Sequence, residues 1–331
     1  MVSDPKNAYS ERCSKRRRSE LYGISARIGV TTLLHTALLQ GAGALGRWLS
    51  NCIYASQNIG DAAATVAAGA IDAAVYLLAF ILPAVFCLAV IPVEHRGGLG
   101  MRPAFPDDFG LVFLPSLGAV LLISDLGGYI FDHIGMPPDT ASDLPRGWVG
   151  IAVAIINVVI LPALCEELLF RGCIYSALEG QGSGVAVVGS ALLFALMHNS
   201  LRAMPHTFAA GLIFACLRRA SASLWPSIVL HLANNALYLI LPLMAARLEP
   251  TDAHVFLQSS HAAVVLLGII SAAAWAILKK KRKRDKNIGG DVIQERPSGH
   301  ASEFFSPIMV IYIITAIALA VLRMLFTRVE I

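Results

Sequence analysis

Three pairs of side chains at a spacing of four residues stand in apolar stretches of the sequence. The pairs are Glu167 with Arg171, Phe194 with His198, and His231 with Asn235. Because residues four apart share one face of a helix, each pair is expected to point in one direction. An ionisable side chain at the centre of a membrane helix costs about 2.5–3.5 kcal/mol, and such residues are functional candidates by default.

The first pair lies in the run ALCEELLFRG, where a second carboxylate, Glu166, directly precedes Glu167. Glu167 comes before Arg171, which is the favourable order for an ion pair on a helix. Glu166 lies about 100° around the helix, so its carboxylate is expected to face elsewhere. An ion pair at a water-exposed helix end, with Arg171 reaching the interface, explains the pair but leaves Glu166 without a role. Pro162 removes a backbone hydrogen bond and is expected to bend this helix.

Structural interpretations exist for the other two pairs as well. His198 could be a hydrogen-bonded residue of its helix, and His231 and Asn235 could link membrane helices. Together, however, the three groups contain what hydrolysis requires. A carboxylate can act as general base on water, imidazoles can bind a metal or polarise the water and leaving group, and an amide can donate to an oxyanion. Three other polar residues are interpreted as structural: His35, Asp125 and His206.

Composition indicates what kind of element must position these residues. The chain has 331 residues, of which 56% are hydrophobic and 15% charged, and its mean hydropathy is +0.66. Soluble domains usually carry about 25% charged residues. A chain this long and this apolar predicts an all-α, polytopic transmembrane bundle.

Nine apolar segments are long enough to be candidate spans: 26–48, 71–93, 109–131, 147–175, 185–200, 204–219, 224–245, 261–278 and 307–327. About eight of them form the main bundle, residues 26–278, and the ninth is a C-terminal helix within 307–331. The spans 185–200 and 204–219 are short and are predicted to be a tilted or incomplete pair. Two further parts are predicted, a basic N-terminus (1–25) and a basic linker (279–306).

Basic residues cluster at Arg12–Arg18 and again at Lys279–Lys286. Such runs can bind nucleic acid, but here each adjoins an apolar span and is better interpreted as a cytoplasmic anchor. An even number of crossings separates the clusters, which places both in the cytoplasm with the N-terminus. Membrane lipid, including anionic lipid, is therefore an expected partner and nucleic acid is not.

The motifs EExxxR (from Glu166), FxxxH (Phe194 and His198) and HxxxN (His231 and Asn235) resemble the signature of the CPBP family. Its members are CAAX-processing and bacteriocin-processing intramembrane proteases, also called the Abi or type II CAAX prenyl endopeptidase family. The resemblance covers roughly residues 145–245, the predicted protease core. It implies a helical bundle around a membrane-embedded cavity that is open toward the cytosol.

The resemblance also implies roles for single residues. Glu166 would activate the attacking water with help from His198, and His231 and Asn235 would stabilise the oxyanion or complete a metal site. Glu167 and Arg171 would support them. The family is called metalloprotease, but the chain has no HExxH zinc motif. If Zn²⁺ binds, its expected ligands are His198, His231 and either Glu166 or Glu167.

The expected activity is hydrolysis of a peptide bond in a membrane-associated substrate with a hydrophobic or lipidated segment, for example a prenylated one of the CAAX type. Two other functions fit part of the pattern. In a non-catalytic immunity or scaffold protein of the same fold, the polar residues would only hold helices together. In a proton-coupled transporter, the carboxylate would carry the proton, but the two related halves usual for transporters are not visible in the sequence.

Overall fold

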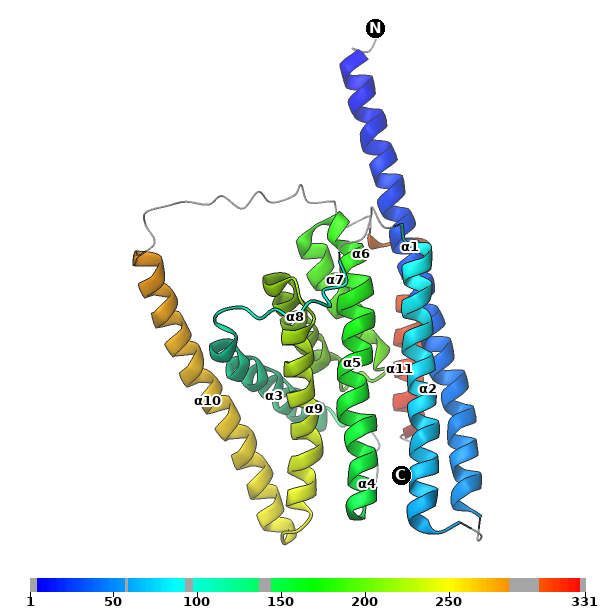
Figure 1. Cartoon of the computed structure of the whole chain (residues 1–331), viewed down its shortest axis with the longest axis vertical. Coiled ribbons are helices and arrows are strands. Elements are labelled where there is room, and N and C mark those ends of the chain that lie inside the picture. The colour runs from blue at the N-terminus through cyan, green and yellow to red at the C-terminus, as the bar shows by residue number, and fades with distance from the viewer. Residues whose placement is uncertain (1–4, 57–58, 93–97, 137–143, 286–303, 328–331) are drawn as a thin grey trace.

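The chain folds into a bundle of long helices. The computed structural model describes residues 5–56, 59–92, 98–136, 144–285 and 304–327, and every regular element within these ranges is a helix. The longer helices are α1 (Pro5–Tyr54), α2 (Asp61–Val90), α3 (Phe109–His133), α7 (Ser183–Met197), α8 (Met204–Ser221), α9 (Trp225–Ala245), α10 (Pro250–Asp285) and α11 (Pro307–Thr327). The prediction of an all-α fold is confirmed (Figure 1).

All nine predicted spans are helical. In the described part of the chain, seven helices are long and apolar enough to cross a membrane: α1, α2, α3, the composite helix Gly147–Gln181, α9, α10 and α11. The two others are the pair predicted to be short or incomplete. Helix α7 has only 15 residues, and α8 ends with Arg218 and Arg219 in its last turn. The protein is therefore a multi-pass integral membrane protein.

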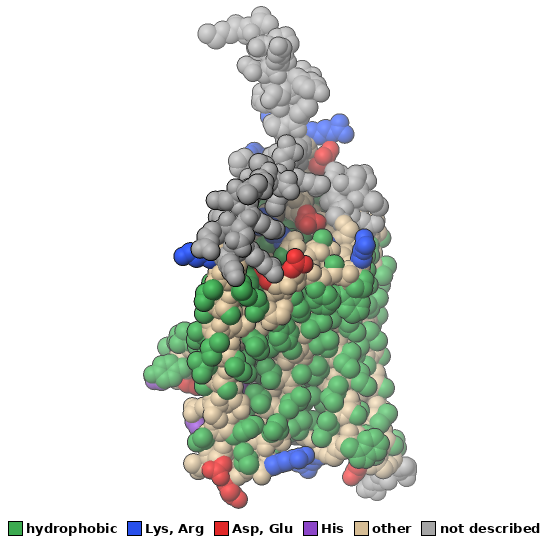
Figure 2. All heavy atoms as spheres, turned by 60° about the vertical axis from the view of Figure 1, so that its left-hand side comes forward, with side chains coloured by type: hydrophobic (Ala, Val, Ile, Leu, Met, Phe, Trp, Pro, Cys, Tyr) green, Lys and Arg blue, Asp and Glu red, His purple; other side chains and the backbone are tan. Residues whose placement is uncertain are grey.

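The outer surface of the bundle is suited to lipid. Figure 2 shows hydrophobic side chains over the middle of the visible face, with charged side chains gathered toward the two ends. On α2 the exposed residues include Leu77, Leu78, Ile81, Leu82 and Val85. In a soluble protein so large an apolar patch would promote aggregation, whereas a bilayer covers it.

Helix α1 continues past the bundle, and α10 ends with its basic residues toward the same end of the bundle (Figure 1). Helix α1 has 50 residues, or about 75 Å at 1.5 Å per residue, and a hydrocarbon core is only about 30 Å thick. Its burial in the bundle begins by Leu21 and Ile24, before the predicted boundary at residue 26. Helix α10 continues through most of the second basic cluster, Lys279–Lys286, and ends at Asp285. The described parts of both basic regions are thus helical. Residues 286–303 of the predicted linker lie outside the described residues.

The composite helix in the middle of the bundle alternates between α and π geometry. It consists of α4 (Gly147–Ala154), π-helical η2 (Ile155–Ile160), α5 (Leu161–Glu167), π-helical η3 (Leu168–Ile174), α6 (Tyr175–Leu178) and 3₁₀-helical η4 (Glu179–Gln181). Pro162 has no N–H to donate to the preceding turn, and the wider η2 turn stands directly before it. Such π turns are frequent at functional sites. Segment α5 contacts α2 and α9, and η3 contacts α2, α7 and α8.

The C-terminal helix α11 is an integral part of this bundle. It packs against α1 and α7, and its buried side chains include Met309 and Tyr312. Helix α1 has a glycine at the contact, where a Cβ on Gly29 would lie 2.9 Å from the backbone nitrogen of Met309. The hydroxyl of Tyr312 lies 3.5 Å from the carbonyl oxygen of Leu193 in α7. These contacts fix α11 beside the helices that carry the predicted site.

Candidate active site

Glu167 and Arg171 form the predicted ion pair, at the junction of α5 and η3. Arg171 Nη1 donates to Glu167 Oε1 over 2.9 Å, and both side chains are 0% exposed. The interpretation as a helix-end pair at the water interface is therefore wrong. The pair lies inside the bundle because α2, α7, α8 and α9 surround this part of the composite helix.

Aromatic rings and a backbone carbonyl complete the surroundings of Arg171. Its guanidinium carbon lies 4.2 Å from the ring centre of Phe194 and 5.1 Å from that of Phe214. Nη2 donates to the carbonyl oxygen of Gly211 over 3.2 Å. A cation over aromatic faces is stabilised by their electron-rich surfaces, and more so away from water. Arg171 thus ties η3 to α7 and α8.

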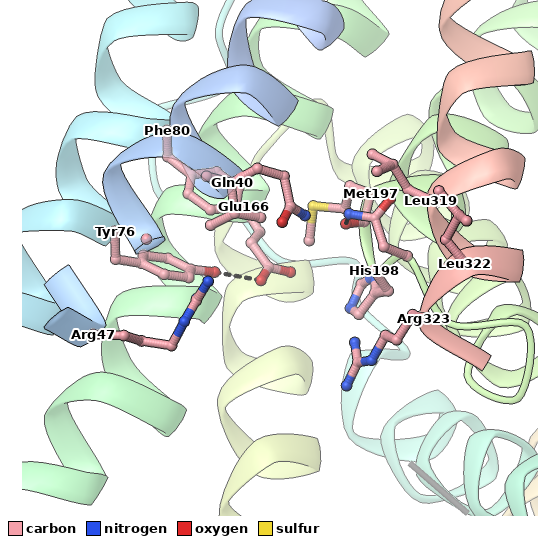
Figure 3. Close-up of a pocket in the computed structure, with 13 residues that line it drawn as sticks. Gln40, Arg47, Tyr76, Phe80, Glu166, Met197, His198, Leu319, Leu322 and Arg323 are labelled. Atoms are coloured by element: carbon pink, nitrogen blue, oxygen red, sulfur yellow. Dashed lines mark hydrogen bonds between the residues drawn. The ribbon is translucent and has the colours of Figure 1, made fainter. Parts of the chain in front are cut away.

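Glu166 faces away from this pair, as helix geometry predicts. It is 6% exposed, and its Oε1 accepts a hydrogen bond of 2.5 Å from the hydroxyl of Tyr76 in α2 (Figure 3). Its Oε2 has no hydrogen-bond partner among the described residues. The nearest basic group to Oε2 is Nε2 of His231, at 3.8 Å. Tyr76 therefore holds one carboxylate oxygen, and the other makes no hydrogen bond to the described residues.

His231, in α9, stands between the two carboxylates. Its Nδ1 lies 3.1 Å from Glu167 Oε1. A carboxylate accepts, so in the neutral ring Nδ1 carries the proton and Nε2 presents a lone pair toward Glu166. The ring stacks on Phe214, with ring centres 5.0 Å apart and planes 24° apart. This arrangement fixes both the position and the tautomer of His231.

His198 follows the last residue of α7. Its Nδ1 lies 2.9 Å from the carbonyl oxygen of Phe194, which can only accept, so Nε2 is the acceptor in the neutral ring. Phe194 contacts this ring as well, with centres 5.0 Å apart. Together with Glu166, His198 lines one cavity, which the short length of α7 permits.

That cavity has a volume of about 810 Å³ and is formed by five elements. Its lining residues are Leu39, Gln40, Gly43 and Arg47 of α1, Tyr76 and Phe80 of α2, Glu166 of α5, Met197, His198 and Asn199 at the end of α7, and Leu319, Leu322 and Arg323 of α11. Helices α1 and α11 contribute from their C-terminal halves, at the end of the bundle opposite to the basic clusters (Figure 1). The resemblance implied an opening toward the cytosol, and the direction of the opening stays a prediction.

Asn235 does not line the cavity. Its amide nitrogen donates to the carbonyl oxygen of Val158 in η2, over 3.2 Å. A π-helical turn leaves carbonyl groups available for such bonds, and Asn235 supplies one donor. In this arrangement Asn235 supports the composite helix, and the amides that do line the cavity are Gln40 and Asn199.

Residues 148–237 match the family model of the Rce1-like type II CAAX prenyl endopeptidases. The matched segment contains all seven predicted site residues and confirms the family resemblance over this part of the chain. Helices α1, α2, α3, α10 and α11 lie outside it. No curated protein and no solved structure matches the chain.

The zinc ligands expected from the sequence are His198, His231 and either Glu166 or Glu167. Among the described residues, no group of three or more His, Cys, Asp and Glu side chains is arranged to hold a metal ion. Nδ1 of His231 is turned to Glu167, whose Oε1 also accepts from Arg171. These bonds leave Nε2 of His198, Nε2 of His231 and Oε2 of Glu166 unused among the described residues, so zinc binding by the residues named from the sequence stays a prediction.

Sequence reasoning missed Tyr76, Phe214 and the two cavity arginines. In the sequence, Tyr76 stands out as a possible site residue only because it carries a hydroxyl group within an aliphatic span. The polar residues interpreted as structural have contacts that suit that role. Nδ1 of His35 lies 2.8 Å from the carbonyl oxygen of Ala79, and Asp125 pairs with His261 at 3.0 Å, linking α3 and α10. His206 lies beside Tyr238, with ring centres 6.4 Å apart.

Proposed function

We propose that this protein is an intramembrane endopeptidase of the CAAX type that hydrolyses a peptide bond in a membrane-associated, hydrophobic or lipidated substrate. The observation that carries the proposal is the state of Glu166. Its carboxylate is buried in a membrane bundle, Tyr76 holds one oxygen, and the other oxygen has no hydrogen-bond partner among the described residues and lies beside an imidazole. Oε2 of Glu167 also lacks a partner, but Glu167 is ion-paired with Arg171 and does not line the cavity, whereas Glu166 does.

In the proposed reaction Glu166 acts as general base. Oε2 takes a proton from a water molecule in the cavity, and the resulting hydroxide attacks the carbonyl carbon of the scissile bond. His198 accepts the other hydrogen of the water at Nε2, which orients the oxygen for attack. Tyr76 prevents rotation of the carboxylate. The oxygen that becomes negative is stabilised by donors lining the cavity, for which the amides of Gln40 and Asn199 are the candidates.

The second half of the reaction returns the proton. His231 Nε2 lies 3.8 Å from Glu166 Oε2 and presents a lone pair, so the abstracted proton can be shared between the two groups. Glu167 accepts from Nδ1 of His231 and stabilises the ring when it is charged. Delivery of the proton to the amide nitrogen breaks the carbon–nitrogen bond and releases a carboxylic acid and an amine.

Cleavage of a prenylated or otherwise hydrophobic peptide by protein reconstituted in liposomes tests the proposal. We expect Glu166→Gln, Glu166→Ala and His198→Ala to lower kcat by about 10²–10⁴, the usual contribution of a general base. Glu20→Gln, at an exposed position of α1, is the control and should cleave normally. Unchanged cleavage in both Glu166→Ala and His198→Ala would refute the enzymatic role, and biological activity retained by Glu166→Gln would favour a scaffold.

Zinc remains a separate prediction. Metal analysis of the purified protein, together with the same measurement on His198→Ala and His231→Ala, determines whether a metal is held by the residues named from the sequence. Stoichiometric zinc that is lost in both variants supports it.

A further inference from the structure

Two residues of the proposed reaction stand in the short turn between α7 and α8, which comprises residues 198–203 and belongs to neither helix. His198 orients the water in that reaction, and Asn199 is a candidate donor to the oxyanion. Both residues line the cavity. Groups of this kind must be held within about 0.5 Å of the productive geometry. The turn therefore needs a support that fixes it relative to the rest of the bundle.

The bonds within the turn do not supply this support. Asn199 has a φ of 49°, in the left-handed region, and such a conformation persists only where the surroundings enforce it. Its amide nitrogen donates to the carbonyl oxygen of Met197 over 3.0 Å. The hydroxyl of Ser200 accepts from the backbone N–H of Ala203 over 3.0 Å, where α8 begins. These bonds shape the turn locally, but they do not connect it to another helix.

Arg202 connects the turn to the end of α3. Its Nη1 donates to the carbonyl oxygen of Met136 over 3.2 Å. Its Nη2 donates to the carbonyl oxygen of Gly128 over 3.4 Å and to Oδ1 of Asp132 over 2.6 Å. All three acceptors lie in the last turns of α3 or just past its end at His133. One guanidinium thus joins the turn to a helix outside the segment that matches the family model.

The chemistry of arginine suits this contact. The carbonyl groups at the C-terminal end of a helix carry partial negative charge, so a cation is favourable there. The planar guanidinium can also donate to several acceptors at once, which a lysine ammonium on a flexible stem does less well. The side chain of Asp132 is 63% exposed and that of Arg202 is 19% exposed, so water screens the ion pair. Loss of the carboxylate alone should therefore weaken the connection without breaking it.

We infer that Arg202 is a positioning residue, which anchors the turn 198–203 to the end of α3 and thereby holds His198 beside Glu166. The inference rests on the proposed function and adds to it a residue that does not line the cavity. Without the anchor the imidazole would no longer be fixed where it orients the water, so kcat should fall. The walls that α1, α2 and α11 contribute to the cavity do not depend on this anchor, so KM should change little.

Amide hydrogen exchange of the full chain in detergent, read by mass spectrometry, tests the anchor without any need for cleavage. In Arg202→Gln we expect the turn to exchange about tenfold faster than in the wild type, as for the loss of one or two hydrogen bonds. Arg202→Lys and Asp132→Asn should show smaller increases. Arg218→Gln is the matched control, because Arg218 also donates to a backbone carbonyl, that of Gly98, but stands at the opposite end of α8. It should leave exchange in the turn unchanged.

Kinetics in two backgrounds then separates positioning from a general loss of stability. We expect Arg202→Gln to lower kcat by about 10- to 100-fold, the scale of a small misplacement of a reacting group, and Arg202→Lys to restore part of it. In a His198→Ala background the same change should have a much smaller effect, because the group that it positions is already gone. Any loss of kcat in Arg218→Gln should be the same in both backgrounds.

Unchanged exchange of the turn in Arg202→Gln would overturn the inference. So would a loss of kcat in Arg202→Gln that is equal in the wild-type and His198→Ala backgrounds. Faster exchange in Arg202→Gln, together with no cleavage by the wild type, would overturn the proposed function alone and would support the anchor.

Discussion

At the scale of single residues, Arg171 shows how this site tolerates buried charge. Its guanidinium has an ionic partner in Glu167, a carbonyl partner in Gly211 and aromatic faces from Phe194 and Phe214. Buried ion pairs often add little net stability, because desolvation offsets the attraction. Removal of one partner is much more harmful, since the other charge is then left buried and unpaired.

The first prediction at this scale is that Arg171→Met lowers the free energy of unfolding by about 3–5 kcal/mol. The double variant Glu167→Gln with Arg171→Met should lose clearly less, because no uncompensated charge remains. Thermal denaturation in detergent measures both. Arg16→Met is a matched control, since Arg16 pairs with Glu20 at the same spacing with side chains 85% and 42% exposed, and exposed pairs contribute at most about 1 kcal/mol. A single variant as stable as its double variant would contradict this account.

For single residues, the sequence predicted the side-chain directions and pairings that follow from helix periodicity. The pairing of Glu167 with Arg171 and the separate direction of Glu166 both follow from spacings of four residues and one residue. Tyr76 could not be predicted in this way, because 90 positions separate it from Glu166. The same holds for Asn235, whose partner is a backbone carbonyl exposed by a π turn. Contacts of this kind depend on how the helices pack.

At the scale of elements, the close approach of α7 and α8 positions the histidine end of the site. A Cβ on Gly211 of α8 would lie 3.0 Å from the Cα of Ala191 in α7. Backbone atoms cannot move aside as side chains can, so the absence of a side chain at Gly211 permits this contact. Small residues allow the same kind of approach between helices in many membrane proteins.

We therefore expect Gly211→Ala to force α7 and α8 apart. The cost should be about 1–3 kcal/mol, as for other overpacked cores, and cleavage should fall because Phe194 and His198 lie further along α7. Gly184→Ala is the control in the first turns of α7, where a Cβ would meet nothing within 4 Å. Melting temperature and kcat are measured for both variants. Equal melting temperatures and kcat values in the two variants would show that the contact of Gly211 with Ala191 does not limit the packing of α7 against α8.

Hydrophobicity predicted which segments form helices, and also that α7 and α8 are short. The ends of the helices were harder to predict, because the α1 and α10 helices continue through charged sequence beyond their apolar parts. The π turns around Pro162 were not predicted. A proline indicates that one hydrogen bond is missing, but whether the helix bends or widens depends on the helices packed around it.

At the scale of the whole molecule, the two basic extensions lie at one end of the bundle and the turn between α1 and α2 at the other (Figure 1). We expect the basic end to be cytoplasmic, since positively charged loops are retained there. Cys52, in the last turn of α1, is exposed. It should therefore lie on the outer side of the membrane.

A membrane-impermeant maleimide tests this orientation. In a variant that keeps only Cys52, we expect labelling of intact cells. With Cys52 also removed and Arg16→Cys introduced, labelling should require permeabilised cells, because that position lies on the basic extension. Labelling of both positions from the same side would contradict a crossing by α1, and the reversed pattern would place the N-terminus outside.

The surroundings of Arg171 also bear on how the protein is made. Apart from Glu167, the residues that contact its guanidinium all follow it in the sequence, namely Phe194, Gly211 and Phe214. When the ribosome has delivered the helix Gly147–Gln181 to the translocon, these partners have not yet been synthesised. Insertion of this segment into the bilayer must therefore be driven by its aliphatic residues. Each contributes an insertion free energy of about −0.3 to −0.6 kcal/mol at the helix centre. Its charges are enclosed only when α7 and α8 arrive, so a nascent chain that stalls before them exposes ionised groups to lipid and is a natural target for membrane quality control.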